Sequence, residues 1–186
     1  MTRGGAALSS RDPPVLVCAD LQAQYLAEDR FAGSEAERCL ALLELWRTEL
    51  WPVLHLKRIA QAAWFDPASN LTDWGAVIRP QPGEMVFEHP LPSAYSSARF
   101  AEYTSNIRNI RCVVMGFSLD ETILSTVIEG FHRSHRYEVI EDAVACRHTG
   151  VDNAASYKSA VVRVIGNFAG IRHSADLIGA SGRMAI

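Results

Sequence analysis

The sequence predicts an α/β fold, a three-layer α/β/α sandwich. Apolar runs typical of buried strands alternate with helical patterns along the whole chain, no repeat or linker divides it, and its 186 residues suit one domain. Strands buried on both faces belong to parallel sheets, and their crossovers are right-handed. We expect residues 13–186 to form a single domain, preceded by a flexible tail over residues 1–12.

The first half of the chain provides three strands and one helix. Residues 14–20 are a run of apolar residues without alternation that ends at Asp20, which predicts a fully buried strand. Ser34 caps a helix over residues 35–50, with acidic residues in its first turn. Strands follow at residues 52–57 and 85–88. The long loop between them, residues 58–82, has a length that is often functional.

The second half continues the alternation. We expect a helix over residues 97–106, a strand at 111–115, a helix to about residue 135, a strand at 137–141, a helix over 153–167 and a short strand at 170–172. The junction Ser118-Leu119-Asp120-Glu121 fits the S-x-x-E capping box, which explains it structurally. A helix start also favours developing negative charge, so the same turn can serve as an oxyanion hole.

Composition excludes several classes of function. The chain has 18 basic and 21 acidic residues, a net charge of −3, which favours neither nucleic acid nor an anionic membrane as partner. No segment has the apolar length of a membrane span or a signal peptide, so we expect a cytoplasmic protein that acts on a small molecule. The four cysteines form no CxxC pair or zinc spacing, and no cofactor motif is present.

Polar residues follow several predicted strands, and ligand sites in such sheets lie beyond the carboxyl ends of the strands. Asp20 can act as a general acid or base, or can accept backbone N–H groups to fix its loop. His89 can shuttle a proton near neutral pH, or can be a surface hydrogen-bonding group. The segment 117–122 ends at the same edge, so these groups can converge.

The layout resembles the isochorismatase-like cysteine hydrolases over about residues 14–145. Four pieces carry the resemblance: an apolar strand ending in Asp20-Leu21-Gln22, a Pro-Gly and strand leading to His89 and Ser93-Ala94-Tyr95, the junction from Gly116 to Thr126, and a strand ending in Asp142-Ala143. The resemblance implies a Rossmann-like sandwich with a mainly parallel six-stranded sheet. It also implies a site built on an aspartate, a lysine and a cysteine.

Two of those three catalytic identities differ in this sequence. Asp20 stands at the aspartate position, His89 at the lysine position and Thr122 at the cysteine position. An aliphatic hydroxyl remains protonated where a thiol can form a thiolate, so the thioester route of the family is not expected here. The isochorismatase branch, which by resemblance also lacks the cysteine, needs chiefly the aspartate as an acid on a vinyl ether.

The resemblance therefore implies two alternatives. The first is a divergent hydrolase of a small molecule, with Asp20, His89 and Thr122 as catalytic residues; the second is a non-catalytic relative that binds a small molecule or serves as an assembly subunit. Relatives of this type form dimers or larger oligomers. The Asp-x-His metal motif of nicotinamidases is missing, so we expect no metal. The predicted substrate-binding residues are Gln22, Tyr25, Trp64, Tyr95, Phe117 and Ser118.

Overall fold

The structure is a computed structural model that describes residues 13–23, 34–59, 73–75, 78–107, 109–147 and 153–181. The predicted tail, Tyr25, Trp64 and most of the predicted loop over residues 58–82 lie outside the described residues. Among the described residues, no helix has the length and apolar character needed to cross a membrane.

Six parallel strands form one sheet in the order β3-β2-β1-β4-β5-β6, which confirms the predicted mainly parallel sheet. The strands are β1 (Val15–Ala19), β2 (Val53–Arg58), β3 (Met85–His89), β4 (Arg111–Phe117), β5 (Arg136–Ala145) and β6 (Gly170–Arg172). The chain moves outward from β1 to β3 and then returns to place β4 on the other side of β1. The carboxyl ends of β1 and β4 therefore form the switch point in strand order, where open α/β sheets bind ligands.

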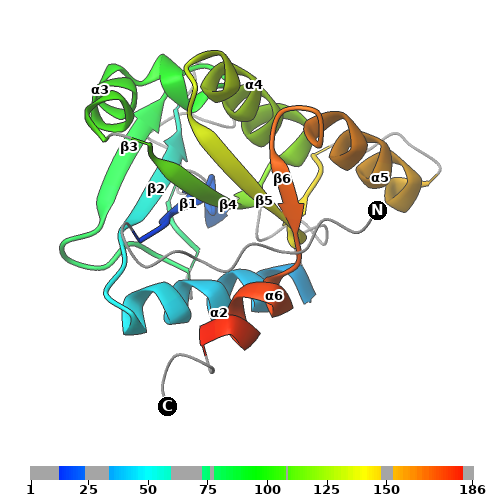
Figure 1. The fold of residues 1–186 in the computed structure, drawn as a ribbon, viewed down its shortest axis with the longest axis horizontal. Helices are drawn as coiled ribbons and strands as arrows, with labels where there is room; N and C mark the ends of the chain where they lie inside the picture. The colour runs from blue at the N-terminus through cyan, green and yellow to red at the C-terminus, as the bar shows by residue number, and fades with distance from the viewer. Residues whose placement is uncertain are drawn as a thin grey trace.

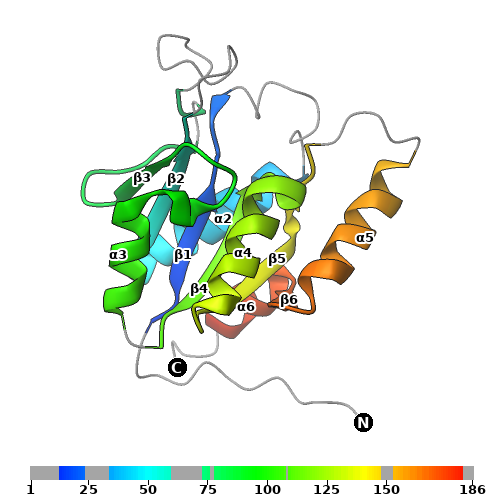
Figure 2. The same ribbon diagram turned by 90° about the horizontal axis from the view of Figure 1, so that it is seen from above.

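Helices cover both faces of the sheet, as predicted (Figures 1 and 2). Helices α3 (Ala98–Asn106), α4 (Leu124–His132) and α5 (Ala154–Ile165) lie on one face, and α2 (Ser34–Thr48) and α6 (Ser174–Ser181) lie on the other. Two clusters of buried side chains fill the interfaces. Every residue of β1 is buried, because the strand lies in the centre of the sheet between both layers.

The predicted capping box at the start of α4 does not form. The chain instead makes a single π-helical turn over Leu119–Ile123, in which the Ile123 N–H donates to the Ser118 carbonyl at 2.9 Å. The Glu121 carboxylate accepts from Arg147 at 2.9 Å and does not reach back to cap the turn. The Ser118 hydroxyl is buried and has no hydrogen-bond partner among the described residues.

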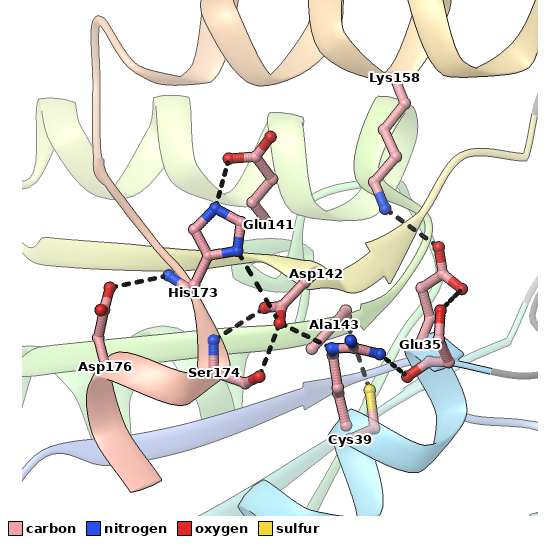
Figure 3. Close-up of polar contacts among 11 residues, drawn as sticks. Glu35, Cys39, Glu141, Asp142, Ala143, Lys158, His173, Ser174 and Asp176 are labelled. Carbon is pink, nitrogen blue, oxygen red and sulfur yellow. Dashed lines mark hydrogen bonds and ion pairs between the residues drawn. The ribbon is translucent and has the colours of Figure 1, made fainter. Parts of the chain in front are cut away.

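Helix α6 was not predicted, and a carboxylate on β5 holds it in place (Figure 3). Strand β5 runs past its predicted end, and its register with β4 shifts between Val114 and Gly116. Asp142 lies in this irregular part. It accepts from the Ser174 N–H at 2.8 Å, the Ser174 hydroxyl at 2.7 Å and the Arg38 guanidinium at 2.8 Å. One carboxylate thus joins β5, α2 and the first turn of α6.

Replacing Asp142 by Ala should lower the free energy of unfolding by about 2–3 kcal/mol, because three hydrogen bonds to one charged group are lost. Urea denaturation measures the change. Asp176→Ala is the matched control, since the exposed Asp176 accepts a single hydrogen bond within the described part of the chain, from the His173 N–H at 3.2 Å. Its loss should cost about 1 kcal/mol or less. Equal losses in the two variants would show that Asp142 does not hold α6.

Candidate active site

Asp20 lies directly after β1, at the switch point of the sheet. Its backbone has φ 47°, a left-handed conformation that Asp adopts more readily than most residues. The Asp20 N–H donates to the Leu56 carbonyl, and the Asp20 carbonyl accepts from the Gln22 N–H. Backbone hydrogen bonds therefore fix the turn on both sides. The side chain is only 1% exposed. A carboxylate in this position needs polar partners, because burial without them is costly.

His89 provides the first of those partners. It is the last residue of β3 and is fully buried. Its Nε2 lies 2.8 Å from Asp20 Oδ1, and its Nδ1 lies 2.8 Å from the Leu91 carbonyl oxygen. Both ring nitrogens therefore have partners, and the imidazole has one orientation.

Thr122 provides the second partner. It lies in the π-helical turn before α4, and its hydroxyl donates to Asp20 Oδ2 at 2.7 Å. The structure thus brings the three predicted catalytic residues, Asp20, His89 and Thr122, into one buried hydrogen-bonded cluster. Each comes from a different element at the carboxyl edge of the sheet.

The pKa of His89 is raised above its ordinary value. Burial by itself lowers the pKa, and the nearby positive charge of Arg58 also lowers it. The negative charge of Asp20, the hydrogen bond with Asp20 and the bond to the Leu91 carbonyl together outweigh these effects. The surroundings of His89 therefore favour the imidazolium form.

This raised pKa predicts a pH-dependent contribution to stability. A histidine whose pKa is higher in the folded state stabilises the fold fully below its unfolded pKa of about 6.5, and that stability is lost as the pH rises through the folded pKa. We expect the difference in unfolding free energy between wild type and His89→Gln to be largest at about pH 6 and to shrink by about pH 9. Urea denaturation at both values measures it. A difference between wild type and His89→Gln that does not change with pH would contradict the prediction.

Gln22 was predicted to bind substrate, but its side chain bonds to the backbone of β2. Its amide N–H donates to the Arg58 carbonyl at 3.2 Å, and its amide oxygen accepts from the Arg58 N–H at 2.8 Å. The Arg58 side chain is 9% exposed and lies 3.7 Å from Glu121, which also pairs with Arg147 at 2.9 Å. Gln22 therefore fixes the end of β2, from which Arg58 extends toward the turn that carries Thr122.

Arg58 and Glu121 are charged neighbours of the cluster that were not among the predicted catalytic or substrate-binding residues. Arg58 is the last residue of β2, and its position after an apolar strand was the available signal. Glu121 was assigned to a cap, because the S-x-x-E spacing is typical of one.

Of the other predicted substrate-binding residues, Phe117 ends β4 and Ser118 precedes the π-helical turn that carries Thr122, and both are buried. Tyr95 lies elsewhere. Its hydroxyl bonds to Tyr137 and His135, each at 2.7 Å, and its ring packs against Phe100 in the core. The 3₁₀ turn over Ala94–Ser96 directs the ring to the start of β5, so Tyr95 does not join Asp20.

None of the four cysteines offers a reactive thiolate in place of the cysteine that the resemblance implies. Burial raises the pKa of Cys112 and Cys146 to about 12 and raises the pKa of Cys18 and Cys39 above their usual range. Within the described ranges, no group of three or more His, Cys, Asp or Glu side chains is arranged to hold a metal ion.

Comparison with known proteins identifies the family of the chain. The family model of the isochorismatase domain matches residues 14–170, which is most of the chain. The chain belongs to the isochorismatase family. No curated protein sequence matches it.

Solved structures of isochorismatase-family proteins share the fold. A protein of this family from Chromobacterium violaceum aligns with a TM-score of 0.83 at 21% identity, over 97% of this chain and 100% of that one. An isochorismatase from Pseudomonas putida aligns with a TM-score of 0.77 at 22% identity, over 89% and 93% of the two chains. An N-carbamoylsarcosine amidase from Thermoplasma acidophilum gives 0.68 at 22%, over 87% and 96%. The predicted family and fold are therefore confirmed.

Proposed function

We propose that this isochorismatase-family protein is a divergent hydrolase of a small molecule, in which Asp20 is the general acid/base and no cysteine acts as nucleophile. The Asp20–His89–Thr122 cluster carries the proposal. One carboxylate lies at the carboxyl edge of the sheet, and each of its oxygens has a hydrogen-bond partner. Such an arrangement suits proton transfer, in which a fixed acid contributes about 10²–10⁴-fold.

Thr122 supports Asp20 and does not attack the substrate. An aliphatic hydroxyl needs a strong base to become a nucleophile. Its proton here is directed at a carboxylate, which is a weak base. The Thr122 hydroxyl therefore serves to orient Oδ2, from which it is 2.7 Å away.

A reaction that needs an acid and no protein nucleophile is hydrolysis of a vinyl ether. Asp20 protonates the terminal carbon of the double bond, and the electron pair of that bond forms the new C–H bond. The resulting oxocarbenium ion is attacked by water, and the hemiketal then breaks to a ketone and an alcohol. The first turn before α4 has N–H groups without intrahelical partners, which suit an anionic group on the substrate.

A panel of vinyl ethers and amides tests the proposal. We expect turnover of a vinyl ether that Asp20→Asn removes, while Asp176→Asn, the same charge change at an exposed position on α6, leaves it unaltered. Turnover that survives in Asp20→Asn would refute the assigned role. Amide hydrolysis without vinyl ether hydrolysis would refute the reaction class.

The second candidate function is a non-catalytic binder or assembly subunit. The burial of the cluster favours this candidate. Asp20, His89 and Thr122 are each 3% exposed or less. A ligand bound over a broad pH range without turnover would support this candidate.

We also propose a homo-oligomer, a dimer or tetramer, which sedimentation velocity tests directly.

A further inference from the structure

The Leu91 carbonyl fixes one proton of His89. A backbone carbonyl oxygen only accepts hydrogen bonds, so the Nδ1 atom that lies 2.8 Å from it must carry a hydrogen. A neutral imidazole has one N–H, and Nδ1 holds it here. In the neutral ring, Nε2 consequently carries no hydrogen, and its lone pair points at Asp20.

A second proton is therefore needed between His89 and Asp20. Nε2 lies 2.8 Å from Oδ1, and two lone pairs at that distance would repel each other. We infer that His89 Nε2 and Asp20 Oδ1 share one transferable proton, and that this proton is the one the site donates to its substrate. His89 is thus the proton store of Asp20, and it makes no contact with substrate.

The hydrogen bond from Thr122 determines which oxygen of Asp20 shares the proton with His89. The Thr122 hydroxyl donates to Oδ2 at 2.7 Å, so Oδ2 is already an acceptor and Oδ1 is left for the shared proton. The proton lies on Nε2 in the imidazolium–carboxylate form and on Oδ1 in the imidazole–acid form. The two forms share the same heavy-atom positions, because the proton moves along one hydrogen bond.

Among the described residues, the charged groups that act on His89 come from two neighbouring segments of the sheet. Asp20, after β1, favours the protonated ring, and Arg58, at the end of β2, opposes it. Leu91 contributes only its carbonyl, and Thr122 contributes only a hydroxyl to the partner carboxylate. The balance favours the protonated pair, which agrees with the raised pKa of His89.

The donation of this proton to a substrate rests on the proposed function. The shared proton passes from Nε2 to Oδ1, and the O–H bond breaks as the vinyl carbon takes the proton. This leaves an Asp20 carboxylate opposite a neutral His89. The water that adds to the oxocarbenium ion then gives up a proton, which returns to the pair.

Histidine at this position makes the proton store dependent on pH. A lysine, which the family resemblance places here, keeps its proton to a pKa of about 10.4, whereas an unperturbed imidazole loses it at about 6.5. The Asp20–His89 pair can therefore donate a proton below the pKa of His89, and it has lost that proton above this pKa.

Nitrogen NMR of the ¹⁵N-histidine-labelled full chain tests the proton store without any substrate. Two-bond nitrogen–proton couplings report which ring nitrogens of His89 are protonated. We expect Nδ1 to stay protonated throughout, and Nε2 to lose its proton only above about pH 6.5 in wild type and at lower pH in Asp20→Asn. His132→Gln assigns the exposed imidazole on α4 and should leave His89 unchanged. A bare Nδ1, or an Nε2 that loses its proton at the same pH in wild type and in Asp20→Asn, would overturn the inference.

The pH dependence of turnover tests the donation. Wild-type activity should fall tenfold per pH unit above the pKa that NMR gives for His89, and His89→Lys should hold its activity across that range. Activity in wild type that ignores the His89 titration would overturn the donation and leave the proposed hydrolase intact. If no substrate turns over, the hydrolase proposal fails while the NMR result still decides where the proton lies.

Discussion

Asp20→Asn is expected to lower turnover by about 10²–10⁴-fold, the contribution of a positioned general acid, and to leave the fold intact. The asparagine can satisfy every partner of the aspartate. Its amide N–H₂ can donate to the bare Nε2 of a neutral His89, and its amide oxygen can accept the Thr122 hydroxyl. The change thus removes a proton and a charge pair without leaving a buried polar atom unpaired.

Two measurements separate this outcome from simple unfolding. The unfolding free energy of Asp20→Asn should stay within about 1 kcal/mol of wild type at a pH above the His89 titration of both proteins, where the ring is neutral in each. Asp20→Ala should cost about 2–4 kcal/mol, because Thr122 and His89 both lose their partner in a buried site. An inactive Asp20→Asn that is as unstable as Asp20→Ala would mean that the carboxylate is structural.

The sheet could be predicted because its strands are buried on both faces. The stretch Val15–Ala19 contains only apolar residues, and a short run of this kind, without alternation, is typical of a central strand in a parallel sheet. The ends of the strands were predicted less accurately. Strands β2, β4 and β5 all extend further than predicted, since Arg58, Phe117 and Ala145 remain in the ladder after the apolar run is interrupted.

The convergence of Asp20, His89 and Thr122 could be predicted because parallel strands end at one edge of the sheet. Their separations along the chain are 69 residues for His89 and 102 for Thr122, so only topology brings them together. The proton on His89 Nδ1 depends on the carbonyl of Leu91, and no pattern in the sequence predicts a bond to that atom. The charge state of the site therefore depends on a backbone contact that the sequence does not predict.

Long-range contacts in the structure add to or override several short-range patterns in the sequence. Ser118-x-x-Glu121 is a capping box by spacing, but Arg147 from beyond β5 binds the glutamate. Gln22 follows the strand end, where a substrate-binding residue is expected, and both ends of its amide bond to the facing backbone of Arg58. Helix α6 depends on Asp142, which is 32 residues away from Ser174. Propensity over a local window cannot detect such partners.

Gly116→Ala should lower the free energy of unfolding by about 4 kcal/mol, which makes it the most destabilising single change we expect. Gly116 lies in β4 beside Ala19, with φ +112°, and a Cβ there would lie 2.2 Å from the Ala19 carbonyl oxygen. The conformation alone costs an alanine about 1–2 kcal/mol, and the clash adds about 1–3 kcal/mol because backbone cannot rotate away.

Gly83→Ala separates the two contributions. Gly83 also has a positive φ, +96°, but a Cβ there meets nothing within 4 Å, so only the conformational cost of about 1–2 kcal/mol applies. Because Ala19 directly precedes Asp20, forcing β1 away from β4 should also lengthen the bond from Thr122 to Asp20 and shift the His89 imidazole resonances. Urea denaturation and the histidine NMR spectrum check both effects. A Gly116→Ala protein no less stable than Gly83→Ala would show that β1 and β4 can separate without cost, and that their close approach does not position the site.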